Sequence, residues 1–230
     1  MALLEVENLS IGYRTRKGYL QAVEGVSFSL EEGKSLGFVG ESGCGKTTIG
    51  MALMGLLPPN GMVTKGRILF DDEDLLTLSD SKMRSIRWQK IAMIFQAAMN
   101  ALNPVHRVED QVAEAIMAHN PDLDKTRAKK QVEELFRLVG IPETRMSDYP
   151  HQYSGGMKQR AIIAMALACR PKLIIADEPT TALDVIVQDQ ILKETRELQR
   201  EFNISMIFIS HDISIVADVC HDIGLSLIHI

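Results

Sequence analysis

The sequence predicts an α/β fold in which parallel strands carry polar side chains to one edge of a sheet. Four short apolar runs have the length and composition of buried strands, and they span residues 35–39, 91–95, 173–176 and 206–209. Each run is followed at once by a polar residue or a glycine-rich loop, and helical segments lie between the runs. Because ligands bind outside the carboxyl ends of parallel strands, the four endings predict one composite site.

The first run ends in a glycine-rich loop that fits the phosphate-binding pattern G-x-x-x-x-G-K-[ST]. Its glycines let successive backbone N–H groups point at phosphate oxygens, and the helix that follows adds the positive end of its dipole. We expect Lys46 to reach the β- and γ-phosphates and Thr47 to ligate Mg²⁺. The predicted nucleotide-binding residues here are Gly40, Glu41, Ser42, Gly43, Cys44, Gly45, Lys46, Thr47 and Thr48.

The run at 173–176 ends in two adjacent carboxylates, Asp177 and Glu178. An apolar strand that ends in an acidic residue is typical of Mg²⁺-dependent nucleotide hydrolysis, and we expect Asp177 to bind the metal. Glu178 is placed to polarise a water for attack on the γ-phosphorus. Helix capping ahead of Pro179 is the alternative role for Glu178, and the phosphate loop favours the catalytic one.

A second glycine-rich turn, Ser154-Gly155-Gly156, opens an apolar helix that ends before Pro171. An exposed helix N-terminus behind glycines attracts phosphate. Because the chain already has one phosphate loop, we expect this second anion site to serve a nucleotide held by another subunit. A plain connecting loop is the alternative for such a turn on its own.

The N-terminal part of the chain predicts β structure and one turn. Apolar positions in the first 30 residues indicate short strands that flank the core. The acidic run at 71–74 is interpreted as a solvated turn before a helix over 79–88, and a metal site is the weaker alternative.

Between Gln96 and Tyr153 the pattern becomes helical, with expected helices over 109–119 and 122–139. We therefore expect an inserted helical lobe. The predicted domains are a nucleotide-binding core, residues 1–96 and 159–230, and a helical subdomain, residues 97–158.

Composition narrows the classes of function. The chain has 230 residues, 46% of them hydrophobic, which indicates a globular domain with a substantial core. A formal net charge of −5 disfavours a nucleic-acid partner. Three scattered cysteines predict neither disulfides nor a zinc site, which suits a reducing compartment. No apolar stretch approaches the ~20 residues that span a bilayer, so membrane association is expected through a partner.

Together these residues resemble the ATP-binding-cassette (ABC) family over essentially the whole chain. The order of six elements carries the resemblance: Gly40 to Thr47, Gln96, Tyr153 to Arg160, Ile174 to Pro179, Thr181 to Asp184, and His211. The resemblance implies a RecA-like P-loop NTPase core with N-terminal antiparallel β-strands and an inserted α-helical subdomain. It also implies ATP hydrolysis, with ATP and Mg²⁺ as cofactors.

By resemblance, several site residues act across a dimer. Ser154, Gly155 and Gly156 would bind the γ-phosphate of ATP held by the facing subunit of a head-to-tail dimer, and Asp184 would bridge the two subunits. Gln96 would couple Mg²⁺ and the attacking water to the helical lobe, and it is expected among both the catalytic and the metal-binding residues.

The resemblance also assigns roles to His211 and to one tyrosine. His211 would contact the γ-phosphate and orient the attacking water. Tyr13 resembles the aromatic residue that stacks on adenine, and Tyr19 is the alternative because residues 14–18 make the alignment ambiguous. A packing or surface role stays open for either tyrosine.

Longer strings are similar to the D-type ATPase subunits of dipeptide, oligopeptide and nickel importers. These strings cover residues 40–47, 96–105, 164–172 and 180–185. In the signature, Met157 is usual for this subgroup, whereas Tyr153 departs from the general form LSGGQ.

The subgroup implies a place and a set of partners. The chain is expected at the cytoplasmic face of the cell membrane, with a second, F-type ATPase subunit, two transmembrane permeases and an extracytoplasmic solute-binding protein, and without nucleic acid. Peptide is favoured over nickel as cargo. The choice between a homodimer and a heterodimer stays open, and the heterodimer is favoured.

In two alternative interpretations the chain is an ABC-type ATPase with a function other than peptide or nickel import. One is a cassette of phosphonate degradation, whose signature also reads SGGM, and the other is a mechanochemical ATPase outside transport. A degenerate cassette is disfavoured because Glu178 is present.

At the C-terminus the family continues with a strand and a long tail, whereas this sequence stops after residues 222–230. We expect the last strand to be replaced or cut short and the chain to be truncated.

Overall fold

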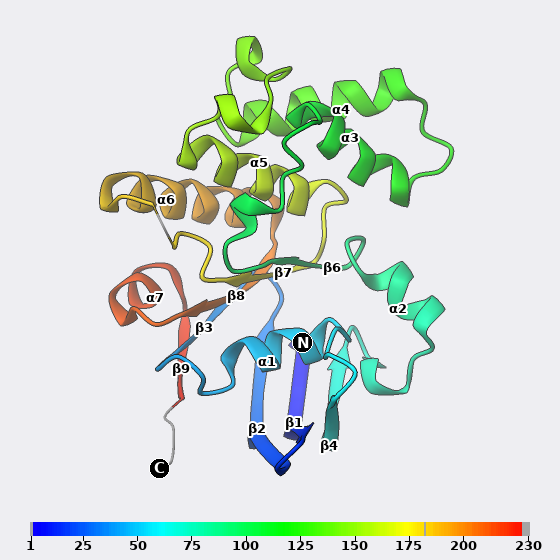
Figure 1. Cartoon of the computed structure of the whole chain (residues 1–230), viewed down its shortest axis with the longest axis vertical. Helices are drawn as coiled ribbons and strands as arrows, with labels where there is room; N and C mark the ends of the chain where they lie inside the picture. Colours follow the sequence, from blue (N-terminus) through cyan, green and yellow to red (C-terminus); the bar gives the residue numbers. More distant parts are fainter. Residues whose placement is uncertain (1, 182, 227–230) are drawn as a thin grey trace. The chain divides into compact units, whose positions relative to one another are not determined.

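A computed structural model describes residues 2–181 and 183–226. The described chain forms two compact units (Figure 1), of which the first comprises Met1–Arg87 with Ser205–Ile230 and the second comprises Trp88–Ile204. The predicted division into a core and a helical subdomain uses other boundaries, and it stays a prediction.

An antiparallel sheet dominates the N-terminal part of the first unit. Its strand order is β2-β1-β4-β5, and the strands are β1 (Ala2–Thr15), β2 (Gly18–Glu31), β4 (Gly61–Phe70) and β5 (Glu73–Asp74). The prediction of short strands here is wrong, because β1 and β2 are each 14 residues long. Register shifts interrupt their pairing, and such irregularities break the alternation of apolar residues that marks a long strand.

The first unit also contains three parallel strands. The central one, β3 (Ser35–Gly40), pairs in parallel with β8 (Ser205–Ser210) and with β9 (Asp222–Ser226). Every residue of β8 is buried, which matches its continuous apolar sequence. A strand thus forms at 222–226, while the end of the chain at 227–230 lies outside the described residues.

Short helices complete the first unit: α1 (Lys46–Leu53), α2 (Asp80–Ile86), α7 (Ile213–Val219) and the 3₁₀ turn η1 (Leu75–Thr77). The predicted acidic turn precedes α2. Asp71 and Asp72 have φ of 53° and 63°, and the Asp74 side chain caps η1 by accepting from the Leu76 N–H. Helix α2 begins after Ser79, whose hydroxyl accepts from the Lys82 N–H.

The second unit consists of two parallel strands, which pair with each other, and a group of helices. The strands are β6 (Ile91–Ile94) and β7 (Leu173–Asp177). The helices are α3 (Val108–His119), α4 (Lys125–Leu138), α5 (Gly155–Leu167) and α6 (Val185–Phe202), with 3₁₀ turns η2 (Ala98–Asn100), η3 (Glu143–Arg145) and η4 (Pro150–Gln152). Helices α3, α4 and α5 pack on one another, as Figure 1 shows.

The predicted helices of this unit form close to their expected positions. Helix α4 starts at Lys125 because the Asp124 carboxylate accepts from the Arg127 N–H and so caps its first turn. Of the apolar positions on which the helix was predicted, Val132, Phe136 and Val139 are buried and Leu135 is half-buried.

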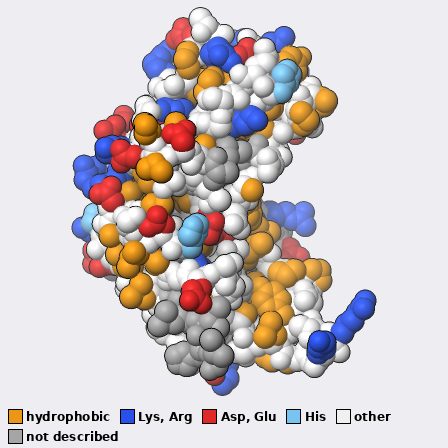
Figure 2. Space-filling model, turned by 60° about the vertical axis from the view of Figure 1, so that its left-hand side comes forward, with side chains coloured by type: hydrophobic (Ala, Val, Ile, Leu, Met, Phe, Trp, Pro, Cys, Tyr) orange, Lys and Arg blue, Asp and Glu red, His pale blue; other side chains and the backbone are white. Residues whose placement is uncertain are grey.

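Basic and acidic side chains are intermingled on the face drawn in Figure 2. Within the described ranges, no helix combines the length and the apolar character needed to cross a membrane.

Gly37 is the closest packing point in the strand that precedes the phosphate loop. A Cβ at this buried position would lie 1.9 Å from Cγ1 of Val216 and 3.0 Å from Sγ of Cys220, so α7 leaves no room for a side chain on β3. We expect Gly37→Ala to lower the free energy of unfolding by about 1–3 kcal/mol, measured by denaturant titration. Adding Val216→Ala should recover part of this loss, and strictly additive effects would contradict the contact.

Candidate functional site

The phosphate loop of the first unit is curled as its glycines require. Gly43 and Gly45 have φ of 87° and 94°, in the left-handed region that other residues rarely adopt. At Gly45 a Cβ would also lie 2.6 Å from the carbonyl oxygen of Ala22 on β2. Gly45 is therefore required twice, by backbone conformation and by the close approach of the neighbouring strand.

Lys46 lies inside this curl. Its side chain donates hydrogen bonds to the carbonyl oxygens of Gly40 at 2.7 Å and Glu41 at 2.8 Å, and to Sγ of Cys44 at 3.2 Å. The residue is only 6% exposed, so its charge is held at the centre of the loop. A cation surrounded by backbone groups at a helix N-terminus is a site that suits phosphate.

Tyr13 lies against the same helix, whereas Tyr19 lies over β1. The Tyr13 hydroxyl is 3.1 Å from Oγ1 of Thr48, in the first turn of α1. Tyr19 is 51% exposed and packs over Gly12 on β1. Of the two predicted adenine-stacking candidates, Tyr13 is the one next to the phosphate loop, and stacking itself stays a prediction.

His211 follows β8 directly, at the edge where β3 enters the phosphate loop. Val39 pairs with Ser210 in the parallel register, so His211 and Gly40 are the next residues of neighbouring strands. The next residue, Asp212, accepts from the Ser214 hydroxyl at 2.6 Å and from the Ser214 N–H at 2.9 Å, and these bonds lower the pKa of its carboxyl. Asp212 thus caps α7, and His211 is exposed just before it.

In the second unit, the ends of β6 and β7 bring two predicted residues into contact. The register pairs Ile94 with Ala176, and the Nε2 group of Gln96 donates a hydrogen bond of 2.9 Å to Oε2 of Glu178. Asp177 ends β7 and is 2% exposed. Glu178 itself has φ of 47°, so its backbone turns sharply after the strand.

Thr181 also belongs to this group, although the sequence analysis names it only as part of the string Thr181 to Asp184 and predicts no role for it. Its hydroxyl donates a hydrogen bond of 3.0 Å to the same oxygen of Glu178 that Gln96 contacts. The turn that begins at Glu178 brings Thr181 back, because the Thr181 N–H donates to the Glu178 carbonyl oxygen at 3.2 Å. A hydroxyl three residues after the acidic residue is the signal that could have identified it.

The signature turn and Asp184 form two capped helix N-termini in the second unit. The Ser154 hydroxyl accepts from the Met157 N–H at 3.2 Å, and the Asp184 carboxylate accepts from the Val187 N–H at 3.0 Å. The two ends are adjacent, because a Cβ on Gly156 would lie 2.8 Å from Cγ1 of Val187. The small residues of the signature therefore let α5 and α6 start side by side.

The predicted residues thus fall into two groups, one in each unit. The first unit holds Tyr13, residues 40–48 and His211, and the second holds Gln96, Asp177, Glu178, Ser154, Gly155, Gly156 and Asp184. Their roles toward nucleotide and metal stay predictions. The chemistry of both groups suits a nucleotide: a buried lysine in a glycine loop, hard oxygen ligands for Mg²⁺, and helix N-termini for phosphate.

Comparison with known proteins decides the family. Residues 23–181 match the family model described as ABC transporter. The chain belongs to the ABC transporter family. The predictions of an ABC-type ATPase and of its fold class, a P-loop NTPase core with an inserted helical subdomain, are confirmed.

Among relatives of this ABC protein, the dipeptide transport ATP-binding protein DppD of Bacillus subtilis is 50% identical over 97% of this chain and 67% of its own length. The oligopeptide transport ATP-binding protein OppD of the same organism is 48% identical over 97% of this chain and 63% of its own length. The chain therefore spans about two thirds of the length of these relatives.

Solved ABC structures share the fold. The dimeric ATP-binding cassette MJ0796, in a post-hydrolysis state bound to ADP and Pi, is 26% identical with a TM-score of 0.85, covering 97% of this chain and 94% of that one. The cbiO1 protein of Clostridium perfringens, part of an ABC transporter complex, is 30% identical with a TM-score of 0.83, covering 100% of this chain and 87% of that one.

Tyr153, the departure from the signature form, predicts a loss of stability at alkaline pH. Its ring is buried, its hydroxyl donates to the Arg145 carbonyl oxygen at 2.9 Å, and burial, helped by the charge of Asp148, raises its pKa from 10.0 to about 12. The raised pKa contributes stability that is complete below pH 10 and is lost as the pH rises through about 12.

This loss is measured by denaturant titration across the alkaline range, with tyrosinate absorbance as the direct readout. Tyr153→Phe should remove this part of the pH dependence and cost about 1 kcal/mol at neutral pH through the lost hydrogen bond. An unchanged alkaline slope in the variant would contradict the assignment.

Proposed function

We propose that this chain is the ATP-hydrolysing subunit of an ABC importer and that it powers the uptake of peptides through partner permeases. Support for peptide cargo comes from relatives named for dipeptide and oligopeptide transport at 50% and 48% identity. Nickel uptake, a phosphonate-degradation cassette and a mechanochemical ATPase are the alternatives, and no relative described above is named for any of them.

One observation carries the hydrolytic role of the second unit. The Glu178 carboxylate stands directly after the strand that ends in Asp177, and two side chains, Gln96 and Thr181, donate hydrogen bonds to one of its oxygens. These two donors fix the direction of the Glu178 carboxylate at the end of the strand. This is the arrangement that a water-activating base needs.

The remaining residues fit ATP with Mg²⁺. The Lys46 ammonium and the curled backbone around it suit the β- and γ-phosphates. Thr47 in the first unit, and Gln96 and Asp177 in the second, each carry a side-chain oxygen of the kind that Mg²⁺ prefers, and they are offered as its candidate ligands. Bound Mg²⁺ neutralises charge on the phosphates. Tyr13 beside Thr48 is offered as the adenine contact, and His211 as the group that orients the attacking water.

The signature is proposed to act on a partner's nucleotide. The adjacent N-termini of α5 and α6 form one anion-attracting surface around Ser154, Gly155 and Gly156. The related cassette MJ0796 is a dimer. A head-to-tail dimer, with an F-type subunit as the favoured partner, would place this surface on ATP held by the facing subunit, and Asp184 would bridge the two.

The proposed assembly lies at the cytoplasmic face of the cell membrane. Two permeases would receive the motion of the ATPase dimer, and an extracytoplasmic solute-binding protein would deliver the peptide. No role for nucleic acid is proposed. Co-purification of this chain with two permeases tests the assembly, and its recovery only as a homodimer without them would count against it.

Glu178→Gln should separate binding from turnover. The amide keeps the shape of the side chain but cannot take a proton, so we expect ATP hydrolysis in the reconstituted transporter to fall about 100-fold or more while ATP binding persists and a closed dimer accumulates. Lys46→Ala should instead lose binding, measured with a fluorescent ATP analogue. Glu201→Gln, an exposed carboxylate on α6, is the matched control, and turnover that survives in Glu178→Gln would refute the assignment.

Gln96→Ala and Thr181→Val test whether the Glu178 carboxylate is positioned by its two donors. Each change removes one hydrogen bond to Oε2, so we expect kcat to fall about 10- to 100-fold with little change in KM for ATP. Steady-state phosphate release measures both constants. A rise in KM at constant kcat would assign these residues to nucleotide binding instead.

A further inference from the structure

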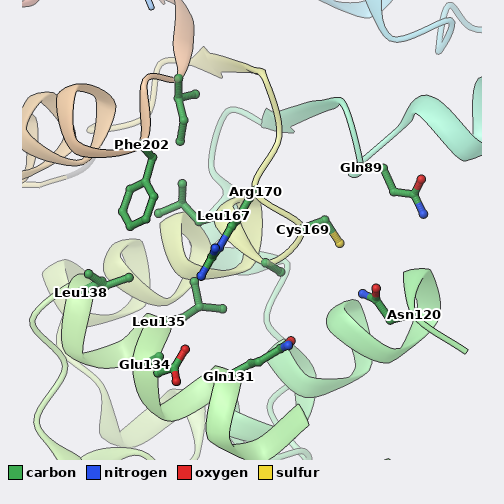
Figure 3. Close-up of a pocket in the computed structure, with 12 residues that line it drawn as sticks. Gln89, Asn120, Gln131, Glu134, Leu135, Leu138, Leu167, Cys169, Arg170 and Phe202 are labelled. Atoms are coloured by element: carbon green, nitrogen blue, oxygen red, sulfur yellow. The ribbon is translucent and has the colours of Figure 1, made fainter. Parts of the chain in front are cut away.

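The second unit contains a pocket that none of the proposed roles uses. Its volume is about 640 Å³, within the range of small-molecule sites. Figure 3 shows it between α4, the end of α5 and the end of α6. Its lining includes Glu134, Leu135, Leu138, Leu167, Arg170 and Phe202.

The pocket has an apolar wall. Leu135 and Leu138 come from one side of α4, Leu167 from the last turn of α5, and Phe202 from the last turn of α6. Leu138 is 38% exposed, so this wall presents apolar surface to the pocket. Nearby, burial raises the pKa of the Cys169 thiol, so this lining sulfur is uncharged at neutral pH.

Two opposite charges stand at this wall. Arg170 extends from the end of α5 across the pocket toward Leu135, and Glu134 projects from α4 (Figure 3). Within the part of the chain that the structure describes, neither side chain makes a hydrogen bond or ion pair. An apolar surface flanked by one cation and one anion matches a ligand that carries both charges on an apolar body.

Side-chain amides form the rest of the polar lining. The Gln89 Nε2 group donates to the His119 carbonyl oxygen at 3.2 Å, and the Asn120 Nδ2 group donates to the Ile116 carbonyl oxygen at 2.9 Å. These bonds hold each amide in place, and the side-chain oxygens can accept from an amide N–H of a ligand. Uncharged acceptors beside a Glu carboxylate disfavour a phosphate-bearing ligand.

We propose that this pocket binds a short zwitterionic peptide with an apolar side chain. Its carboxylate pairs with the Arg170 guanidinium, its ammonium pairs with the Glu134 carboxylate, and its side chain covers Leu135 and Leu138. The site is separate from the nucleotide residues, so its existence does not depend on ATP hydrolysis. That its occupant is imported cargo rests on the proposed function.

The backbone at Arg170 provides a variant that separates binding from folding. Arg170 has φ of 51°, a conformation that glycine adopts without steric cost. Arg170→Gly therefore deletes the guanidinium while the melting temperature stays equal or rises. Glu134→Gln, on the exposed side of α4, removes the second charge with its shape kept. Glu133→Gln is the matched control on the same helix, outside this pocket.

The experiment is calorimetric titration of the 230-residue chain with leucyl-leucine, without nucleotide. We expect saturable binding that weakens about two- to five-fold in Arg170→Gly and in Glu134→Gln, and is unchanged in Glu133→Gln, because an ion pair with an exposed side chain contributes up to about 1 kcal/mol. N-acetyl-leucyl-leucinamide, which lacks both charges and so loses both ion pairs, should bind about 4- to 25-fold more weakly. Methyl resonances of Leu135 and Leu138 should shift on binding.

Three results would overturn the proposal. If leucyl-leucine did not bind at concentrations up to about 10 mM, the pocket would not be a peptide site. Binding that is indifferent to both substitutions would place the peptide elsewhere. If octanoate bound as tightly as the dipeptide, the ligand class of the pocket would be a simple amphiphilic anion and not a zwitterion. A transporter that hydrolyses ATP without importing peptides would refute the proposed function but leave this titration unaffected.

Discussion

Parallel strand pairing determines where the predicted site residues of each unit lie. In the first unit the pairing of Val39 with Ser210 places the phosphate loop and His211 at the same edge. In the second unit the pairing of Ile94 with Ala176 lets Gln96 reach Glu178. A shift of the register by one residue would turn each strand over and separate these groups. The apolar strands therefore contribute to the candidate site indirectly, because their packing fixes the register that places its residues.

Helix termini supply the second constraint. Gly45, Ser154 and Asp184 each stand immediately before a helix, at the positive end of its dipole. Ser154 and Asp184 cap their helices with side-chain oxygens, whereas Gly45 has no side chain and leaves the first N–H groups of α1 to the loop and its ligand. The phosphate loop therefore differs from the signature turn in that the helix after it has no side-chain cap at its N-terminus.

Local sequence patterns selected candidate residues that lie together within each unit, whereas they missed parts of the sheets. The phosphate loop, the two carboxylates and the signature are contiguous, so their chemistry can be read directly from neighbouring residues. Strand β4 was missed because Lys65, Gly66 and Arg67 interrupt its apolar pattern, and the length of β1 was missed because bulges shift its register. The contact of Thr181 with Glu178 was not predicted because it depends on a left-handed turn at Glu178, which no propensity of glutamate indicates.

That left-handed turn also bears on how such a chain can change over generations. A non-glycine residue with φ of 47° costs roughly 1–2 kcal/mol, and glycine or asparagine would relieve it. Substitution of Glu178 by glycine or asparagine would therefore stabilise the fold while it removes the carboxylate. If the proposed role of Glu178 is correct, only selection for turnover retains the acid, and a cassette released from that selection would become more stable as it became inactive.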